Sequence, residues 1–265
     1  MGDAVWVEGA QIARGATAVV TYGAPGTVVK TLLPGVPSIV VTLEADALRA
    51  ARTGGLPVPE LLGTDVEGQP PSLTLAYVDG PELGTMLETR GAEWIGRELA
   101  EIQHQIRSVK APPPLIGLQT YLLEVIARGP LDGRVRHAVL DRISALPGGT
   151  ALCHLDLHPR NVIWNGTSTV IDWNNGSRGD PAADVARTRL LLRSIIHFLP
   201  RRERSHMRPI LIDAETSFAA ATERLAPGLL DASRAWEPVI AAMRWGESPP
   251  AAERRSLEPI LEQIL

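Results

Sequence analysis

The sequence predicts an α+β protein of two lobes, and two observations carry this prediction. Residues 5–78 consist of short runs rich in Val and Thr that are separated by turn signals, which is typical of an antiparallel sheet. The chain after residue 79 is dominated by longer segments with helical periodicity. We therefore expect a small antiparallel β-sheet lobe with one main helix over residues 1–78, and a larger, mostly helical lobe over residues 79–265.

The first lobe should contain five strands and one helix. Residues 24–26 (APG) form a tight turn inside the initial meander. The helix is expected over residues 41–53 and ends at Gly54-Gly55, so Glu44 lies early in it, where a carboxylate suits the helix dipole. The strand-like runs share β-branched residues or leucine and cover residues 5–13, 17–23, 26–33, 55–65 and 72–80.

The second lobe should be built from helices that surround a short β-hairpin. Asn165-Gly166 is a hairpin turn signal between two apolar runs in residues 162–173. Asp180 precedes Pro181 and is expected to cap the next helix. The helical segments have apolar residues at helical spacing and cover residues 81–90, 92–109, 121–129, 134–146 and most of 180–265.

Composition excludes several classes of protein. The 265 residues include 45% hydrophobic residues, which is ample for a buried core, and the net charge of −4 gives no basic footprint for nucleic acid. The single cysteine, Cys153, has no disulfide partner, and the N-terminus has no leader pattern. The longest apolar stretch, 190–199, is too short for a bilayer. We expect a cytoplasmic enzyme without nucleic-acid, membrane or obligate protein partners.

Residues 154–172 place four polar residues at a spacing suited to phosphoryl transfer from a nucleotide. Asp156 comes first, Asn161 follows five residues later, and a short strand leads to Asp172. Asp156 can orient and deprotonate a hydroxyl, while the oxygens of Asn161 and Asp172 can hold Mg²⁺ against phosphates. His154 stands two residues before Asp156. The segment therefore predicts a phosphotransferase that uses Mg²⁺.

Lysine is rare in this chain, which draws attention to each one. Of 26 basic residues only Lys30 and Lys110 are lysines. Lysine offers a compact point charge, whereas arginine offers a planar fork, so a retained lysine can indicate a role that arginine does not fill. Lys110 stands beside a proline-rich loop and is read as a chance survivor, whereas Lys30 lies on the third predicted strand.

The order of Lys30, Glu44, Asp156, Asn161 and Asp172 resembles the aminoglycoside phosphotransferase and choline kinase group, the small-molecule branch of the protein-kinase-like fold. The resemblance implies a bilobal kinase-like fold whose first lobe binds ATP or GTP. It assigns Lys30 to the nucleotide phosphates and Glu44 to the ion pair that holds Lys30, with Asp46 as a less well placed rival. Other nucleotide-binding positions that it implies are Gly15 and Thr17 near the phosphates, and Ala76, Val78 and Ile171 near the adenine.

The family's catalytic loop, H-G-D-x-x-x-x-N, matches at His154, Asp156 and Asn161. The resemblance implies that His154 is a scaffold, that Asp156 handles the acceptor hydroxyl, and that Asp184 in the later DPAAD segment braces the loop. Leu155 stands where glycine is usual, so it restricts the backbone and its side chain must be buried. His158 matches a frequent histidine of this loop and is read mainly as structural, and Arg160 is expected in solvent.

The distance from Asp172 to the next helix indicates the kind of acceptor. The gap is short and lacks the longer activation segment of a protein kinase, so a small hydroxylated molecule is expected. The acceptor stays open between an aminoglycoside, with a role in antibiotic resistance, and a metabolite alcohol such as choline, homoserine or a sugar. A polycationic acceptor calls for an acidic cleft, to which Asp213, Glu215 and Glu247 could contribute.

Two other classes remain as alternatives. His154, Asp156 and His158 alternate and could bind zinc in a hydrolase, but this leaves the upstream lysine and glutamate unexplained. An inactive nucleotide-binding module is the second alternative, because Leu155 departs from the loop pattern and the phosphate-binding turn contains one glycine, Gly15.

Overall fold

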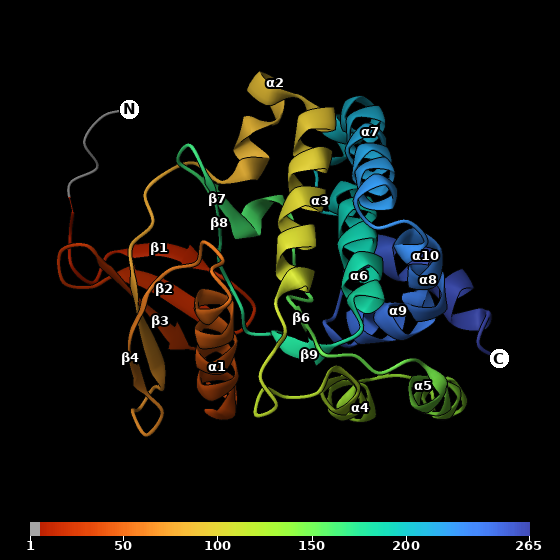
Figure 1. Ribbon diagram of the computed structural model, residues 1–265, viewed down its shortest axis with the longest axis horizontal. Helices are drawn as coiled ribbons and strands as arrows, with labels where there is room; N and C mark the ends of the chain where they lie inside the picture. The colour runs from red at the N-terminus through yellow and green to blue at the C-terminus, as the bar shows by residue number, and fades with distance from the viewer. Residues whose placement is uncertain (1–5) are drawn as a thin grey trace.

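The computed structural model describes residues 6–265, and its first part is a five-stranded antiparallel sheet (Figure 1). The strand order is β1-β2-β3-β5-β4, so the first three strands form the expected meander and β5 pairs with β3. Their β-branched and leucine side chains fit a pleated surface. The strands are β1 (Gln11–Arg14), β2 (Ala18–Tyr22), β3 (Thr27–Leu32), β4 (Leu61–Asp65) and β5 (Ser72–Ala76).

Helix α1 (Ile39–Thr53) packs against this sheet and brings Glu44 into the interior (Figure 1). Val41, Ala45 and Leu48 are buried along one face, which is the pattern of an amphipathic helix. The helix begins two residues earlier than expected, so Glu44 lies in its second turn and no acidic residue lies in the first. Because the dipole acts mainly within the first turn, the expected dipole interaction of Glu44 is wrong.

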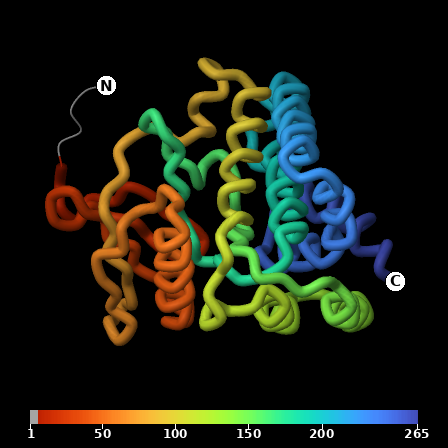
Figure 2. Tube along the Cα trace, viewed as in Figure 1, coloured from red at the N-terminus to blue at the C-terminus, as the bar shows by residue number. Residues whose placement is uncertain are grey.

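The rest of the chain is mostly helical and centres on the contact between α3 (Ala92–Ser108) and α7 (Arg201–Leu225) (Figure 2). A Cβ at Gly96 would meet the backbone of Ala214 and Phe218, so glycine is what allows this close approach. The remaining helices are α2 (Leu87–Arg90), α4 (Leu118–Arg128), α5 (Gly133–Ala145), α6 (Pro181–Ser194), α8 (Leu229–Ser233), α9 (Glu237–Gly246) and α10 (Ala251–Glu262). Short 3₁₀ turns lie at Leu83–Met86, Pro159–Asn161, Ile195–His197 and Arg234–Trp236.

Four short strands lie between the N-terminal sheet and the helices (Figure 1). Two of them lie within the segment 154–172, and the other two lie just before and after it. The hairpin predicted around Asn165-Gly166 is present, although its loop spans residues 165–167. One buried core joins α1 and β5 to this region, since Leu48 and Leu75 cluster with residues that include Leu157 and Trp173. The strands are β6 (Ala151–Cys153), β7 (Val162–Trp164), β8 (Ser168–Val170) and β9 (Ser177–Gly179).

The α+β arrangement of a small antiparallel sheet and a larger helical part is confirmed, with local differences. The strand expected over residues 55–65 begins only at Leu61, because Pro57 and Pro59 cannot donate to a ladder. Val5, the expected start of the first strand, lies outside the described residues. The sheet ends at Ala76 and helical turns begin at Leu83, so we propose the lobe boundary between residues 78 and 79. Among residues 6–265, no helix combines the length and apolar character that crossing a bilayer requires.

Candidate active site

Lys30 joins the two parts of the chain through its ammonium group. Its side chain shares a buried strand face with Leu32, because alternate residues of a strand point the same way. Lys30 Nζ lies 2.7 Å from Glu44 Oε1 on α1 and 2.6 Å from Asp172 Oδ1 beyond β8. Asp46, the rival partner, instead pairs with Arg49 at 2.9 Å on the surface. Lys30 therefore contacts both the carboxylate expected to hold it and the carboxylate expected to bind metal.

The two carboxylates keep Lys30 charged. Burial alone would lower the pKa of Lys30, but the charges of Glu44 and Asp172 outweigh burial and raise this pKa above its ordinary value. Lys30 and Glu44 are nearly inaccessible, whereas the Asp172 side chain is 37% exposed. A ligand can therefore reach this cluster from the Asp172 side.

The segment around Asp172 is fixed by packing on both sides. Asp172 has a left-handed backbone with φ of 63°, which aspartate adopts more readily than most residues. Trp173 is fully buried and donates its Nε1–H to the Val170 carbonyl at 3.1 Å. A Cβ at Gly176 would meet the Cβ of Ala47, so α1 packs directly on this segment. The same helix thus carries Glu44 and supports the backbone that holds Asp172.

His154 uses both ring nitrogens in hydrogen bonds inside the protein. Its Nδ1 lies 3.1 Å from the backbone N–H of Asp156, so Nδ1 is the acceptor and the proton resides on Nε2. Nε2 then donates to the Ile171 carbonyl at 3.1 Å. Burial lowers the pKa of His154, which keeps the ring neutral in this arrangement. The ring therefore ties the loop of Asp156 to the backbone just before Asp172.

Asp184 binds the backbone of the same loop from α6. Its two carboxylate oxygens accept the N–H groups of His154 at 3.0 Å and Leu155 at 2.7 Å. The first turn of α6 is itself fixed by Asp180, which accepts the Ala182 N–H at 2.9 Å, as its predicted capping role requires. The start of α6 and the loop thus form one hydrogen-bonded unit.

Leu155 occupies a left-handed backbone conformation with φ of 59°. That conformation costs a residue with a side chain about 1–2 kcal/mol relative to glycine. The Leu155 side chain is fully buried in the helical core, as expected, and its carbonyl accepts from Arg187 Nε at 3.0 Å. Packing and hydrogen bonding therefore offset the strain and hold the loop in place.

Asp156 is held by groups on both carboxylate oxygens. Oδ1 lies 3.1 Å from Arg187 Nη2, and Oδ2 lies 3.2 Å from Asn161 Nδ2 and 3.7 Å from His158 Nε2. Burial would raise the pKa of Asp156, but the neighbouring His158 and the charge of Arg187 outweigh burial and lower this pKa below its ordinary value. Asp156 is therefore an ionised carboxylate with a fixed orientation.

Arg187 and Glu247 extend this arrangement in a way that the sequence pattern did not indicate. The Arg187 side chain is 1% exposed, and its Nη2 lies 2.6 Å from Glu247 Oε1. Arg187 follows Asp184 by three residues on the same helix, and that spacing puts both side chains on one face. This helical spacing was the available signal for Arg187. For Glu247, which follows α9, nothing local in the sequence indicates a contact with α6.

Asn161 and its neighbours complete the loop. Asn161 Nδ2 also donates to the Asp156 carbonyl at 2.9 Å, so its amide group is oriented by the residue beside it. His158 accepts the Arg160 N–H at 3.2 Å, in keeping with its structural interpretation. Arg160 is 78% exposed and pairs only with the surface residue Glu82, as expected of a solvent-facing side chain.

The weaker nucleotide-binding positions lie at the edges of the sheet. Gly15 and Thr17 occupy the β1–β2 turn, where the Gly15 N–H donates to the Ala18 carbonyl at 2.9 Å. The Ala76 N–H donates to the Glu60 carbonyl at 2.9 Å, so the free group of Ala76 toward a ligand is its carbonyl. Val78 follows β5. The backbone of Ile171 is occupied by the loop, since its N–H donates to the Asn161 carbonyl at 3.0 Å.

The zinc alternative does not fit this geometry. A zinc ligand must offer a free ring nitrogen, and both nitrogens of His154 already make hydrogen bonds inside the protein. Within residues 6–265, no group of three or more His, Cys, Asp or Glu side chains is arranged to hold a metal ion. Lys110, the second lysine, has an exposed side chain, and its backbone bridges to Ala151 at the start of β6.

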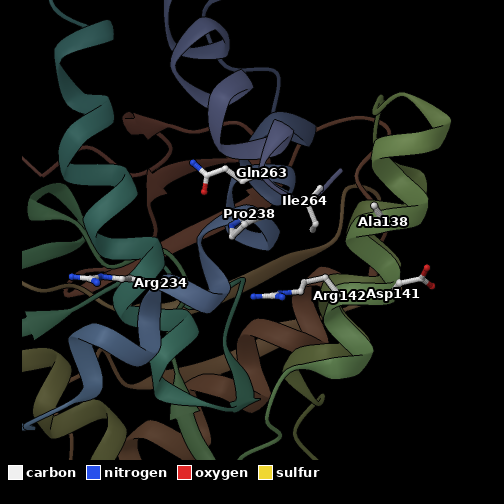
Figure 3. Close-up of a pocket in the computed structure, with 7 residues that line it drawn as sticks. All are labelled: Ala138, Asp141, Arg142, Arg234, Pro238, Gln263 and Ile264. Atoms are coloured by element: carbon white, nitrogen blue, oxygen red, sulfur yellow. The ribbon is translucent and has the colours of Figure 1, made fainter.

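A separate hollow of about 390 Å³ lies in the helical part, between α5 and the helices near the C-terminus (Figure 3). None of the candidate site residues described above lines it. Two of its three charged residues have surface partners: Asp141 lies 3.4 Å from His137, and Arg234 lies 3.2 Å from Asp231. The candidate site is therefore the cluster around Lys30, Asp156 and Asp172.

Solved structures of similar fold cover nearly the whole chain. Aminoglycoside phosphotransferase APH(4)-Ia, as a thermostable mutant in ternary complex with ADP and hygromycin B, has a TM-score of 0.64 at 18% identity, with 96% of this chain and 92% of that chain covered. An aminoglycoside-3'-phosphotransferase of type VIII has a TM-score of 0.60 at 19% identity over 90% and 93% of the chains. A choline/ethanolamine kinase family protein from Mesorhizobium loti has a TM-score of 0.55 at 16% identity over 98% and 88%.

These likenesses confirm the kinase-like fold. No curated protein sequence gives a significant match to the chain. The family description "Phosphotransferase enzyme family" matches residues 9–227, which include Lys30, the catalytic-loop segment and Asp184. That match spans most of the chain and confirms the resemblance inferred from the motifs. This chain belongs to the phosphotransferase enzyme family.

Proposed function

We propose that this chain is a small-molecule kinase that transfers the γ-phosphate of ATP or GTP to a hydroxyl group, in the manner of the aminoglycoside phosphotransferases. The observation that carries the proposal is the contact of Lys30 Nζ with both Glu44 and Asp172, at 2.7 Å and 2.6 Å. Binding of a nucleoside triphosphate requires a cation near the phosphates, a carboxylate that positions this cation and a carboxylate that can bind the metal ion. A neighbour of the same fold binds ADP.

In this proposal the first lobe orients the nucleotide. Lys30 binds the phosphates, and Glu44 keeps the ammonium group in position. The backbone N–H groups of Ala16 and Thr17, in the turn that Gly15 begins, face the phosphates, where such groups stabilise anions. The adenine is bound by the Ala76 carbonyl, the Val78 backbone and the side chain of Ile171.

Asn161 and Asp172 are the proposed ligands of Mg²⁺. They offer an amide oxygen and a carboxylate oxygen, and hard oxygen donors of this kind are what Mg²⁺ prefers. The Asn161 amide is oriented by Asp156, and Asp172 is the accessible carboxylate of the Lys30 cluster. When bound, Mg²⁺ neutralises charge on the phosphates during transfer.

Asp156 is proposed to orient the acceptor hydroxyl and to take its proton. The lowered pKa of Asp156 keeps the carboxylate ionised, so it is a hydrogen-bond acceptor for the hydroxyl at neutral pH. A loose transition state requires little basicity, because the proton leaves after the phosphoryl group has begun to transfer. His154 and Asp184 support this step by fixing the loop backbone.

The acceptor is proposed to be a small hydroxylated molecule. An aminoglycoside acceptor would make the enzyme an antibiotic-resistance protein, and two neighbours of the same fold are aminoglycoside phosphotransferases. A metabolite alcohol is the alternative, because another neighbour is a choline/ethanolamine kinase family protein. A kinase that consumes nucleotide triphosphates would act in the cytoplasm.

The test is release of ADP or GDP with each nucleotide and a panel of hydroxylated antibiotics and metabolites, in the presence of Mg²⁺. Asp156→Asn should abolish acceptor-dependent release while a fluorescent nucleotide analogue still binds, and Asp172→Ala should abolish release. Asp231→Asn, an exposed change of the same kind on α8, is the matched control and should retain full activity. Unchanged phosphotransfer in Asp172→Ala would refute the proposal.

A further inference from the structure

The acceptor side of Asp156 is lined by carboxylates that are already paired. The nucleotide side of the site is defined by Lys30 and Asp172, whereas Asp156 Oδ1 faces Arg187 on α6. Arg187 in turn contacts Glu247, which follows α9. The side of Asp156 that faces away from Lys30 is therefore bordered by groups from α6 and from the segment after α9.

Both oxygens of Glu247 are bound by guanidinium groups, one of them buried. Oε1 lies 2.6 Å from Arg187 Nη2, and Oε2 lies 2.6 Å from Arg244 Nη1. Arg244 is 13% exposed, and it also makes contacts of 2.7 Å and 3.0 Å with the fully buried carboxylate of Glu253. The charges form a closed chain from Asp156 to Glu253 in which each carboxylate has an arginine partner.

Two further glutamates of the helical part are paired with arginine as well, whereas Asp213 is exposed on α7 and makes no ion pair within residues 6–265. Glu215, one of the acidic residues singled out in the sequence, contacts Arg189 at 2.8 Å and Arg193 at 2.9 Å. Glu237 contacts Arg189 at 3.5 Å. Arginine is thus the partner of each of these glutamates of the helical part.

These pairs are unfavourable for binding a polycation. A cleft attracts polycations when it presents carboxylates without partners, because their summed field draws the ligand in. Each oxygen of Glu247 already accepts from a guanidinium group, so two neighbouring cations oppose the approach of an ammonium group to this carboxylate. The acceptor side therefore gives a polycation little net attraction.

Neutral hydrogen-bonding groups complete this side of the site. Tyr121 on α4 lies among the charges of Glu247, Arg187 and Asp156, and burial together with Glu247 raises its pKa, so its hydroxyl stays protonated. It donates to Asn175 Oδ1 at 2.8 Å. Asn175 is thereby oriented, and its Nδ2 is a donor that suits the oxygen of a hydroxylated ligand.

We infer that the acceptor is an uncharged polyhydroxylated small molecule, and that Arg187 and Arg244 exclude polycations by neutralising Glu247 beside Asp156. The inference rests on the proposed kinase function and names the substrate class of that same site. The γ-phosphoryl group passes from the nucleoside triphosphate to an acceptor oxygen, and a nucleoside diphosphate leaves. The proton of that acceptor hydroxyl goes to Asp156. Because the acceptor is uncharged, hydrogen bonds rather than ion pairs hold it.

The test compares acceptors that differ only in charge. Kanamycin A and its fully N-acetylated derivative present the same hydroxyl groups with and without ammonium groups, and glycerol, sugars and inositol widen the uncharged set. Release of ADP or GDP measures turnover, and calorimetry with kanamycin A and spermine measures polycation binding. The wild-type protein should prefer an uncharged acceptor to its cationic counterpart by about tenfold or more in kcat/KM, and should not bind spermine.

The double variant Arg244→Gln/Glu253→Gln frees one oxygen of Glu247 without leaving the buried carboxylate of Glu253 unpaired. It should gain affinity for spermine and kanamycin A, and adding Glu247→Gln should remove that gain. Preference of the wild-type protein for kanamycin A over its acetylated form would overturn the inference. The inference would also be overturned if the protein bound nucleotide but phosphorylated none of the uncharged compounds. Failure of the proposed function would differ from both, since phosphotransfer would then be unchanged in Asp172→Ala.

Discussion

Lys30 Nζ lies 2.6 Å from Asp172 Oδ1, although 142 positions separate the two residues in the chain. The contact joins the third strand of the sheet to the segment that follows β8. The ammonium group is thus bound by the same carboxylate that we propose as a metal ligand. The proposed phosphate-binding cation and the proposed metal-binding carboxylate are therefore direct neighbours.

Lys30→Met should abolish activity and destabilise the fold. The variant removes the cation proposed to bind phosphate and leaves the buried Glu44 without a partner. We expect acceptor-dependent ADP or GDP release to fall by at least about 10²-fold, and the free energy of unfolding to fall by about 3–5 kcal/mol. Urea denaturation and the nucleotide-release assay measure these two effects.

The double variant Lys30→Met/Glu44→Gln is the control for the predicted loss of unfolding free energy. The double variant has no unpaired buried charge at position 44, so it should recover much of the lost unfolding free energy while remaining inactive. Equal destabilisation in the single and double variants would contradict the ion-pair explanation.

Arg187→Gln should change the pH dependence of catalysis. Arg187 is one of the groups that lower the pKa of Asp156, so its removal should raise that pKa toward the ordinary value. The acidic limb of the kcat profile should then appear at higher pH than in the wild-type protein, because protonated Asp156 does not accept the hydroxyl proton. Arg189→Gln, which removes an arginine from the same helix but not from Asp156, should leave the limb in place.

Asp156 should also link folding to pH. Its folded-state pKa is below the unfolded value, so its contribution to stability is present above that ordinary value and is lost as the pH falls toward the folded pKa. Denaturation curves collected between neutral pH and pH of about 3 should therefore be less pH-dependent in Asp156→Asn than in the wild-type protein. A pH dependence that the variant does not change would argue against the ionised, buried carboxylate.

His154 should produce a second pH effect nearer neutrality. Burial lowers its pKa below the unfolded value of about 6.5, so stability is fully present above that value and is lost as the pH falls below it. His154→Asn keeps an acceptor near the Asp156 N–H and removes the titrating ring, so unfolding free energies at pH of about 7 and 5 should differ less than in the wild-type protein. His137→Asn, an exposed ring on α5, is the matched control and should preserve the wild-type difference.

Leu155→Gly tests whether packing outweighs backbone strain in the loop. Glycine relieves about 1–2 kcal/mol at a positive φ, whereas loss of a buried leucine side chain costs about 2.7–5 kcal/mol. The variant should therefore be less stable by about 1–4 kcal/mol, despite matching the usual family residue. Thermal and urea denaturation measure the change, and a stabilised variant would show that strain dominates.

The sequence was sufficient to predict the parts of this protein that local chemistry determines. Lys30 and Glu44 could be named as a pair because the rarity of lysine and the family order pointed to the same residues. Asp180 was identified as a helix cap because Pro181 follows it, and the structure confirms the bond. The strand 55–65 was overextended, because apolar character was given more weight than Pro57 and Pro59.

Tertiary contacts account for what could not be predicted. Glu247 is 60 positions from Arg187, and no periodicity relates the segment after α9 to α6. The start of α1 was placed too late, since Ile39 and Val40 are as compatible with a strand as with a helix. Only packing against the sheet decides between them.

Glu247 lies beyond residue 227, where the match to the phosphotransferase enzyme family ends. Substitutions in the segment that contributes Glu247 therefore do not affect the match of residues 9–227 to the family. One partner of Arg187, Asp156, lies within the residues that match the family, and the other, Glu247, lies outside them. Related chains that keep Arg187 but replace the glutamate should have inherited the same chemistry with a different choice of acceptor.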